Sequence, residues 1–530
     1  MNTKNVVATL LALLSVSAMP ASAESAGDWY ERMGKGDCTT ALEELRRGAE
    51  SGDASYQNAL AGAYYDGVCV QRSREDAAAW YRKAALQGHG ASQYGVAYLY
   101  VKGEGLPQDY AQAASWFRKA ADQGHLAAGN WIGWQHEQGL GVQKSVGEAS
   151  RWYRWAAERG DAIAQRNFGR LLFNGSGVKK DVAAAAGWFR KSADQGDADA
   201  QNWIGWMSER GQGLPQDYGQ AVVWYRYAAE QGLAMAQTNL GVLLASGLGV
   251  TKDPEQAAAW YRKAAEQGEP RAQYLLGVAL AGGDGVAKDA HEAVVWYRKA
   301  AEQGRARAQF KLAYAYASGE GVEKSPREAA AWYLKAAEQG DSDAQNNLGL
   351  LYELGDGVRQ DASEAARWYE LSARQGNAWG QRNFALMLRD GEGLPASPIQ
   401  AYAWLNLAAS ADTPHPDAAE ERNALAARLS KAQLQDGQRL ARAWKPGSAM
   451  GAPRVKAEAP APAPAPARTA SADGLYPARP AARPGVTTCN TRCVNGDCYR
   501  TYDSGRKVRF QARQRFNPLT SQFEWDSGAC

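Results

Sequence analysis

A tryptophan recurs every 36 residues through most of this 530-residue chain, and the spacing never slips. A glycine keeps the same step from Gly52 to Gly376. The ten tryptophans are Trp80, Trp116, Trp152, Trp188, Trp224, Trp260, Trp296, Trp332, Trp368 and Trp404. A period of this length without drift predicts stacked supersecondary units rather than one compact enzyme core. Each unit of such a stack contacts mainly its neighbours, and the result is an elongated surface suited to holding partners.

Residues 253–285 show how one unit is built. Asp253 is placed to cap a helix, and Gln256 three residues later is placed to complete a capping box. Gly268 ends this helix in the left-handed conformation that suits glycine. A second helix follows, in which the small Gly277 leaves room for its partner helix. The cap slot is Ser or Asp in all ten copies: Ser73, Asp109, Ser145, Asp181, Asp217, Asp253, Asp289, Ser325, Asp361 and Ser397.

The repeated unit resembles a known family. Residues 257–268 read Ala-x-x-Trp-Tyr-x-Lys-Ala-Ala-Glu-Gln-Gly, and Ala-Gln-x-x-Leu-Gly and Gly-x-Gly-Val follow. This arrangement is similar to the Sel-one-like repeat (SLR), an α-solenoid related to tetratricopeptide repeats, over roughly residues 53–410. The resemblance implies an all-α, right-handed superhelical solenoid of 36-residue helix–turn–helix repeats.

The resemblance also carries an expectation about function. SLR proteins are typically adaptors that assemble protein complexes, and exported bacterial members are often tied to envelope regulation, polysaccharide secretion or host contact. It therefore implies a non-enzymatic scaffold with one or more envelope proteins as partners and no cofactor. The charge is nearly balanced, with Lys+Arg 60 against Asp+Glu 57, which argues against nucleic acid as a partner.

The first residues read as a secretory signal. Lys4 precedes an apolar stretch at residues 6–16 that is too short to span a bilayer. Ala21-Ser22-Ala23 fits the small-x-small cleavage rule. We therefore expect cleavage after Ala23, a periplasmic or secreted mature chain and no later membrane span.

Both ends of the repeat array depart from the pattern. Glu44 and Leu45 replace the Trp-Tyr pair in a half-unit, and Asp412 replaces a helix-ending glycine before two further helical patterns at residues 417–429 and 430–444. We expect a signal peptide (1–23), an N-terminal capping half-repeat (24–52), the repeats (53–410), C-terminal capping helices (411–445), a Pro/Ala-rich linker (446–487) and a small disulfide-rich β minidomain (488–530).

Six cysteines lie only near the two ends of the mature chain, as suits an oxidising compartment. Cys38 precedes the capping helix and Cys69 takes the second glycine slot of the first turn, so both should lie on one edge of adjacent units and form a disulfide. The last four, Cys489, Cys493, Cys498 and Cys530, allow three pairings. We favour Cys493–Cys498 and Cys489–Cys530.

The β minidomain is also basic. Arg509, Arg513 and Arg515 could form a cationic face for acidic glycan, lipid headgroups or peptidoglycan. The alternative is a solvated strand face without a ligand. Glycan or peptidoglycan binding, through this face and the aromatic residues below, is therefore the main alternative to a protein scaffold.

Six aromatic residues break the repeat pattern between residues 108 and 251. Trp131 and Trp203 are 72 residues apart in a slot that is usually polar, so we expect both rings to face outward. Three residues later, Trp134 and Trp206 lie on the same helical side. Exposed aromatic patches usually mark contact surfaces. The predicted partner-binding residues are Trp131, Trp134, Trp155, Trp203, Trp206 and Tyr227, of which Trp155 and Tyr227 fill a slot that usually holds lysine. Extra core packing between units is the competing interpretation.

Catalytic motifs are scarce. Ser176-Gly177-Val178-Lys179 and Ser504-Gly505-Arg506-Lys507 match the first motif of serine β-lactamases, but both fall in glycine turns and the partner motifs are absent. His291-Glu292 starts like a zinc-protease signature, yet Val295 stands where the second histidine belongs. The sequence therefore predicts no catalytic or metal site, and β-lactam hydrolysis is a remote alternative. His89 and His125, in equivalent slots, are interpreted as surface loop residues.

Overall fold

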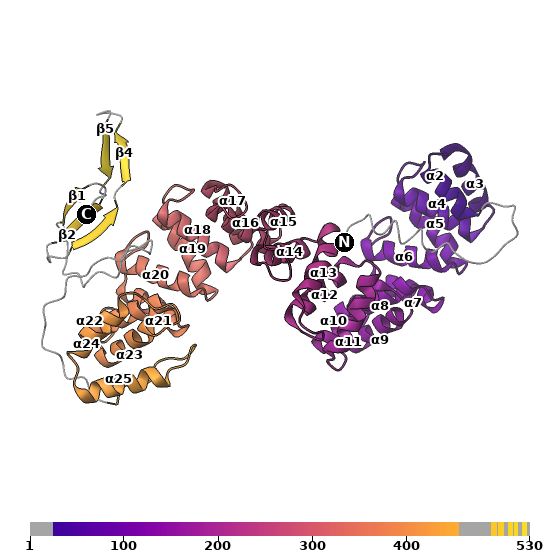
Figure 1. Cartoon of the computed structure of the whole chain (residues 1–530). Coiled ribbons are helices and arrows are strands. Elements are labelled where there is room, and N and C mark those ends of the chain that lie inside the picture. The colour runs from indigo at the N-terminus through magenta and orange to yellow at the C-terminus, as the bar shows by residue number, and fades with distance from the viewer. Residues whose placement is uncertain are drawn as a thin grey trace. The chain divides into compact units, whose positions relative to one another are not determined.

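The computed structural model describes residues 25–454 and the backbone of five strands between residues 489 and 526. The chain divides into two compact units, Met1–Lys252 and Asp253–Cys530, and each is described by itself (Figure 1). The predicted signal peptide and most of the predicted linker lie outside the described residues. Tandem helical hairpins make up both units, which confirms the all-α repeat fold.

In the first unit each helix packs against the next one along the chain. The helices are α2 (Ala26–Gly34), α3 (Cys38–Glu50), α4 (Ala54–Asp66), α5 (Arg74–Leu86), α6 (Gly90–Lys102), α7 (Tyr110–Asp122), α8 (Leu126–Gln138), α9 (Val146–Glu158), α10 (Ala162–Asn174), α11 (Val182–Asp194), α12 (Ala198–Arg210), α13 (Tyr218–Glu230) and α14 (Ala234–Ser246). The sequence did not indicate α2, which packs on α3 and α4.

The second unit continues the pattern with α15 (Pro254–Glu266), α16 (Pro270–Gly282), α17 (Ala290–Glu302), α18 (Ala306–Ser318), α19 (Pro326–Glu338), α20 (Ser342–Leu354), α21 (Ala362–Arg374), α22 (Ala378–Asp390), α23 (Pro398–Ala409), α24 (Ala418–Ala426) and α25 (Lys431–Ala443). The odd-numbered helices from α5 to α23 carry the periodic tryptophans, and we call them tryptophan helices. The even-numbered helices from α4 to α22 carry a glutamine at one matching position in all but α8, where Gly129 stands, and we call them glutamine helices. None of the described helices is both long and apolar enough to cross a membrane.

Five short strands follow: β1 (Cys489–Val494), β2 (Asp497–Tyr502), β3 (Lys507–Gln511), β4 (Arg513–Asn517) and β5 (Gln522–Asp526). They form an antiparallel sheet in the order β1-β2-β3 and a separate β4-β5 hairpin. The backbone register places Cys493 opposite Cys498. The predicted pairings of Cys489, Cys493, Cys498 and Cys530 concern side chains that lie outside the described part of the structure. The same is true of the predicted cationic face of Arg509, Arg513 and Arg515.

The predicted helix starts are correct in position. All ten predicted cap residues occupy the N-cap, and nine of them accept a backbone hydrogen bond; Ser397 does not. The capping box expected at Asp253 does not form, because the Gln256 Nε2 donates to the Asp253 carboxylate at 2.6 Å instead of Gln256 accepting from the cap backbone. Gly268 has φ +90°, the left-handed conformation expected of it.

The second glycine of each turn explains why the period is so strict. At Gly105 (φ +68°) a Cβ would lie 2.1 Å from the Arg74 carbonyl oxygen, at the start of the preceding tryptophan helix. At Gly285 a Cβ would lie at the same distance from the Pro254 oxygen. Only glycine permits this approach and this φ. Each turn therefore packs backbone on backbone, which holds successive hairpins in one register.

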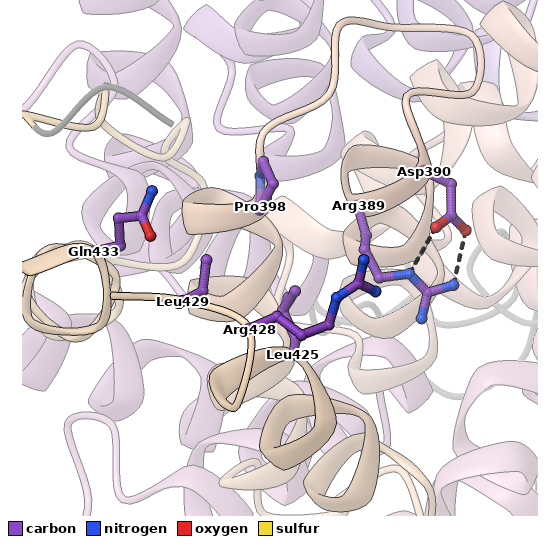
Figure 2. Close-up of a pocket in the computed structure, with 7 residues that line it drawn as sticks. All are labelled: Arg389, Asp390, Pro398, Leu425, Arg428, Leu429 and Gln433. Carbon is purple, nitrogen blue, oxygen red and sulfur yellow. Dashed lines mark hydrogen bonds and ion pairs between the residues drawn. The ribbon is translucent and has the colours of Figure 1, made fainter. Parts of the chain in front are cut away.

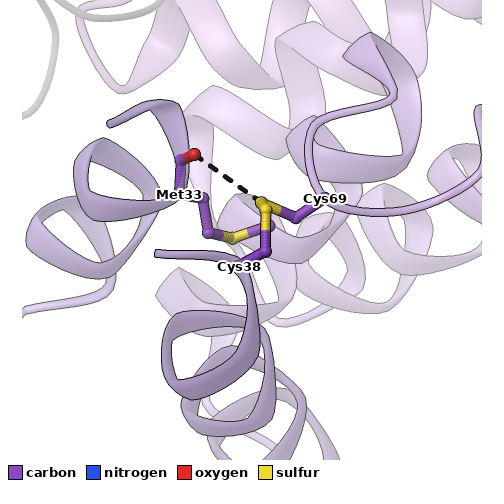
Figure 3. The surroundings of a disulfide bond; sticks show 3 residues. All are labelled: Met33, Cys38 and Cys69. Carbon is purple, nitrogen blue, oxygen red and sulfur yellow. Dashed lines mark hydrogen bonds between the residues drawn. A yellow bond between two sulfur atoms is a disulfide. The ribbon is translucent and has the colours of Figure 1, made fainter. Parts of the chain in front are cut away.

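The first copy replaces this contact with a covalent bond. Cys69 stands in the glycine slot with φ +59°, and Cys38, at the first turn of α3, stands where Arg74 stands one repeat later. The two form a disulfide with a Cα–Cα distance of 5.1 Å, as the sequence predicted (Figure 3). The Cys69 Sγ also lies 3.6 Å from the carbonyl oxygen of Met33 in α2. The disulfide and this contact together attach the turn to both α3 and α2.

A pair of glutamines joins neighbouring repeats through their side chains. The Gln165 Nε2 donates to the Ala157 carbonyl at 3.1 Å, and its Oε1 accepts from the Gln195 Nε2 at 2.8 Å. We call this arrangement a glutamine staple. The same pairing occurs at Gln57–Gln87, Gln93–Gln123, Gln165–Gln195, Gln201–Gln231, Gln273–Gln303, Gln309–Gln339 and Gln345–Gln375.

The helices that close the second unit contain a buried ion pair. Arg382 on α22 is 1% exposed and binds both carboxylate oxygens of Glu421 on α24. His415 lies beside them with its ring 4.1 Å from that of Trp379, and it is 2% exposed. Polar groups therefore fix the position of α24 against α22.

Two histidines packed in the fold, His125 and His415, are expected to make it sensitive to acid. His125 is not the surface loop residue that the sequence indicated: it is half-buried and stacks on Tyr94 at 4.4 Å. His89 is half-buried too and caps α6. Burial lowers the pKa of His125 from 6.5 to about 4. Burial and the charge of Arg382 lower the pKa of His415 to about 3.

Because these folded-state pKa values lie below the unfolded value of 6.5, the unfolded chain binds more protons and stability falls as pH drops from 6.5 toward 4. At pH 5 each histidine should lower the free energy of unfolding by up to about 2 kcal/mol, because a pKa difference of one unit corresponds to about 1.4 kcal/mol. Chemical denaturation at pH 7 and pH 5 measures this loss. H125N supplies the residue that the chain uses at the matching cap, Asn377, and should reduce the loss in the first unit. An unchanged pH dependence in that variant would contradict this assignment.

Candidate partner-binding surface

The four tryptophans of α8 and α12 form two right-angle pairs. Trp131 and Trp134 have ring centroids 5.3 Å apart and an interplanar angle of 84°. Trp203 and Trp206 have centroids 5.7 Å apart and an angle of 82°. We call the first pair the first corner and the second pair the second corner. The structure thus reproduces the same indole geometry at the two matched sites.

The first ring of each corner lies flat on a phenylalanine of the preceding tryptophan helix. Trp131 stacks on Phe117 at 5.8 Å and 3°, and Trp203 stacks on Phe189 at 5.0 Å and 4°. Trp131 and Trp203 are half-buried, so the expectation that their rings face outward is wrong. The packing interpretation holds for one ring face, and the other parts of each corner remain accessible.

The sequence contains a signal for this stacking. The slot of Phe117 and Phe189 holds tyrosine in seven of the other eight repeats, for example Tyr153 and Tyr225. The Tyr153 hydroxyl donates to Glu137 at 3.0 Å, and the Tyr225 hydroxyl donates to Glu209 at 2.7 Å. A phenylalanine needs no such acceptor, and its flat ring receives the indole that follows 14 residues later.

Other aromatic rings close the sides of the corners. Trp131 meets the edge of Tyr98 at 6.0 Å, and its Nε1 donates to the Tyr94 hydroxyl at 3.2 Å. In the second corner Phe173 takes this place, 5.3 Å from Trp203 and 5.6 Å from Trp206. These contacts fix the indoles before any partner arrives, which lowers the entropic cost of binding.

Polar residues flank both corners, and the sequence analysis missed them. Residues 130–137 and 202–209 share the pattern Asn-Trp-Ile-Gly-Trp-x-x-Glu, which was the available signal. The Asn130 Oδ1 accepts from Asn167 at 2.8 Å, and the Asn202 Oδ1 accepts from Asn239 at 3.1 Å. These amides join each corner helix to the next glutamine helix.

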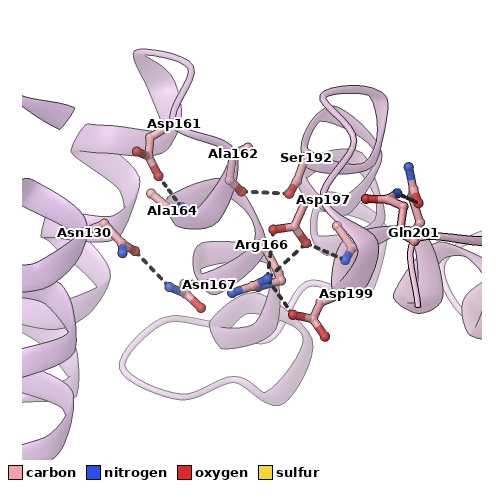
Figure 4. Close-up of polar contacts among 12 residues, drawn as sticks. Asn130, Asp161, Ala162, Ala164, Arg166, Asn167, Ser192, Asp197, Asp199 and Gln201 are labelled. Carbon is pink, nitrogen blue, oxygen red and sulfur yellow. Dashed lines mark hydrogen bonds and ion pairs between the residues drawn. The ribbon is translucent and has the colours of Figure 1, made fainter. Parts of the chain in front are cut away.

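Helix α10 lies between the two corner helices in the sequence and is held by charge (Figure 4). The Arg166 Nη1 binds Asp197 at 2.8 Å and Asp199 at 2.7 Å, both at the start of α12. Burial raises the pKa of Asp197, although Arg166 opposes this effect. Asp197 also caps α12 through the Ala200 amide at 2.8 Å, so one carboxylate positions both helices.

Trp155 and Tyr227 belong to a different layer from the corners. They lie on the tryptophan helices α9 and α13, with edge contacts to Trp152 at 5.7 Å and 66° and to Trp224 at 5.7 Å and 69°. In six other repeats a lysine ammonium covers the periodic tryptophan at this slot, at 3.7 to 4.2 Å. The aromatic residue therefore substitutes for a cation–π contact. Tyr227 is 51% exposed and Trp155 is half-buried.

Trp155 also fills the place of a missing staple. Gly129 stands where the other glutamine helices have glutamine, and a Cβ there would lie 2.6 Å from the Trp155 ring. Arg159 replaces the second staple glutamine, and its guanidinium covers Trp155 at 4.9 Å. These three exchanges form one packing solution, which indicates a structural role for Trp155.

Replacing Trp155 alone with lysine should therefore weaken the α8–α9 hairpin by about 1–2 kcal/mol, because the space beside Gly129 is left empty. The triple variant G129Q/W155K/R159Q supplies the staple residues of the other copies and should recover most of this loss. Hydrogen exchange of α8 and α9 measures both effects. A triple variant no more protected than W155K would contradict the coupling.

The remaining chemical candidates lack a site in the described residues. Ser176 lies in the turn after α10, and Lys179 nearby is exposed. The His291 Nδ1 contacts the Gly321 carbonyl at 3.2 Å. Among residues 25–454 no three His, Cys, Asp or Glu side chains gather in a way that could hold a metal ion. Ser504 and Lys507 belong to the region whose side chains are not described.

A small pocket of about 90 Å³ lies among the closing helices of the second unit (Figure 2). Its lining comprises Arg389, Asp390, Pro398, Leu425, Arg428, Leu429 and Gln433. Asp390 binds Arg389 through two contacts of 2.7 and 2.8 Å. The lining brings together no nucleophile and general base, so this pocket does not suggest an active site.

Comparison with known proteins agrees with the repeat architecture. The Sel1 repeat family matches ten segments: residues 54–89, 90–125, 130–161, 162–197, 198–233, 234–269, 270–304, 306–341, 342–377 and 380–412. No curated protein gives a significant match. Proteins built from Sel1 and related tetratricopeptide repeats typically mediate protein–protein interactions.

Two solved structures are similar over almost their whole length. The crystal structure of c5321, described as a protective antigen in uropathogenic Escherichia coli strains with an SLR fold, is 33% identical with a TM-score of 0.53, and the match covers 79% of this chain and 99% of that one. A Sel1 repeat protein from Oxalobacter formigenes is 32% identical with a TM-score of 0.45, covering 64% and 99%. With ten matched segments spanning most of the sequence, this chain belongs to the Sel1 repeat family.

Proposed function

We propose that this chain is a non-enzymatic exported scaffold that holds protein partners at the two corners. The observation that carries the proposal is the repetition of one right-angle indole pair on α8 and α12, with matching rings beneath each. A few residues carry most of the binding energy of a protein interface, and tryptophan is enriched among them. A partner that reaches both corners would gain from two linked contacts.

Export remains a proposal supported by two features. The N-terminal segment has the order of a signal peptide, with an apolar stretch followed by Ala21-Ser22-Ala23. The Cys38–Cys69 disulfide suits an oxidising compartment such as the periplasm or the cell exterior. Envelope proteins are the partners that such a location would offer.

The proposal is tested by capture with a variant built from residues that the chain itself uses. Asn167 and Leu350 occupy the slots of Trp131 and Trp134 in other copies, so W131N/W134L/W203N/W206L keeps side chains that this fold accepts. Wild type and variant are immobilised, and proteins retained from envelope extracts are quantified by mass spectrometry. A protein lost only with the variant is then purified and titrated against both chains.

We expect the variant to lose at least about a hundredfold in affinity for that protein, because each hot-spot indole contributes about 2 kcal/mol or more. Circular dichroism must show unchanged helicity in the variant. Tyr227 contacts Trp224 on α13, outside the corners, so unlike the sequence prediction the proposed site leaves it out. Y227N, which alters this exposed residue, is the matched control and should bind normally. If the four-indole variant retained the same proteins, the corners would not be the binding site.

Glycan binding is the alternative that the indoles themselves suggest. Sugar rings stack on open aromatic faces, yet one face of Trp131 and of Trp203 is already covered by phenylalanine. This cover favours the protein scaffold. Sedimentation with purified peptidoglycan, for the full chain and for a chain ending at residue 454, separates binding by the corners from binding by the C-terminal segment.

A further inference from the structure

The two corners differ in one charge. At the first corner the Glu137 carboxylate binds the Arg170 guanidinium of α10 at 2.7 Å. At the second corner Glu209 occupies the matching position, but Val242 of α14 stands where Arg170 would be. The Glu137 charge is therefore neutralised from the neighbouring helix, whereas the matching contact at Glu209 is missing.

Glu209 is held in place without being fully neutralised. The Tyr225 hydroxyl donates to its Oε2 at 2.7 Å, which orients the carboxylate but adds no positive charge. Its closest cation is the exposed Arg210, whose Nε lies 3.8 Å away. The Glu209 side chain is 22% exposed, so solvent and partners can reach it.

The carboxylate lies one helical turn from Trp206, on the same side of α12. Trp203, Trp206 and Phe173 thus form an aromatic wall beside an available negative charge. Lys180 already places its ammonium 5.9 Å from the Phe173 ring, at the outer limit of a cation–π contact. A cation that reached closer would gain from the rings and from Glu209 together.

We infer that the second corner binds an arginine side chain of the protein partner, with the guanidinium between the Trp203/Trp206 rings and the Glu209 carboxylate. Arginine fits better than lysine because its planar group stacks on aromatic faces and pairs with both oxygens of a carboxylate. The first corner, with its carboxylate occupied by Arg170, does not select for a cation. This inference rests on the proposed function, and it gives the partner a defined chemistry and direction along the repeats.

The test uses the full chain with ¹⁵N-labelled tryptophan and a blocked tripeptide, acetyl-Ala-Arg-Ala-amide, as the probe. The indole signals of Trp203 and Trp206 are assigned with W203F and W206F. The arginine peptide should shift these two signals. The same peptide with citrulline, which has nearly the same shape and no charge, should bind about fivefold more weakly or not at all.

Four variants distinguish this mechanism from non-specific binding. E209Q should weaken binding of the arginine peptide about fivefold, whereas the matched E137Q should leave it unchanged. V242R supplies the missing arginine and should reduce binding as E209Q does. R170V frees Glu137 and should create a new response at Trp131 and Trp134.

Equal responses to the arginine and citrulline peptides, or full binding by both E209Q and V242R, would overturn the inference. Those outcomes leave the scaffold proposal intact if W131N/W134L/W203N/W206L still loses the captured protein. The opposite result is also possible: the wild-type chain binds the arginine peptide as expected, but the four-indole variant still retains every partner protein. That result would refute the scaffold proposal and leave the arginine site standing.

Discussion

Replacing Glu421 with glutamine is expected to lower the stability of the closing helices α22–α25 by about 3–5 kcal/mol. The reason is that Arg382 would remain buried, at 1% exposure, without its carboxylate. The nearby His415 adds no compensation, since its own pKa is lowered in part by the charge of Arg382. The cost is that of an uncompensated buried cation rather than of one lost hydrogen bond.

Hydrogen exchange is the suitable measurement, because neighbouring repeats can unfold separately and a single melting temperature would average over them. E158Q is the matched control: Glu158 pairs with Arg154 on the surface, with side-chain exposures of 44% and 64%, and should change stability by less than about 1 kcal/mol. Equal protection of α24 in E421Q and wild type would contradict the buried-charge account.

Removing the Cys38–Cys69 disulfide should destabilise α2–α4 by about 3–4 kcal/mol, because the bond closes a loop with a sequence separation of 31 residues. The choice of replacement matters. Cys69 has φ +59°, and every later copy of the slot holds glycine. C38S/C69G should therefore be about 1–2 kcal/mol more stable than C38S/C69S, since the left-handed conformation is unfavourable for serine and not for glycine.

Both variants can be compared with the wild type by hydrogen exchange of α2–α4, with α10–α12 as an internal reference. The reference helices should not change, because each repeat contacts mainly its neighbours. Equal protection in the serine and glycine variants would show that the backbone at residue 69 contributes no strain. Loss of protection throughout the first unit would contradict the local character of the repeats.

Much of the fold was predictable because its signals are local. The N-cap residues and the helix-ending glycines each act within a few residues, the 36-residue spacing repeats them, and the structure places them as expected. The disulfide was predictable for the same reason, since Cys69 replaces a glycine whose place in the turn is fixed. The capping box at Asp253 failed because the Gln256 side chain can either accept from the Asp253 backbone N–H or donate to the Asp253 carboxylate, and no spacing rule chooses between them.

The candidate site was only partly predictable. The matched tryptophans were found from the sequence, but their orientation depends on Phe117 and Phe189 in a different helix. The polarity of the slot in other copies could not reveal a ring that stacks on the preceding helix. Glu209 likewise lacks a partner on α14 because Val242, 33 residues away, stands where the first corner has arginine. This difference can be recognised only by comparing the two corners.

The most direct test of the scaffold account is site-specific photo-crosslinking in the producing cell, which works even when the partner has not been identified. A photoreactive phenylalanine is placed at Trp134, at Trp206 or at Tyr227 in otherwise unchanged chains. The account predicts crosslinked adducts of the same size from Trp134 and Trp206 and none from Tyr227, which lies in the other layer. Adducts from Tyr227 alone, with none from either corner, would contradict it.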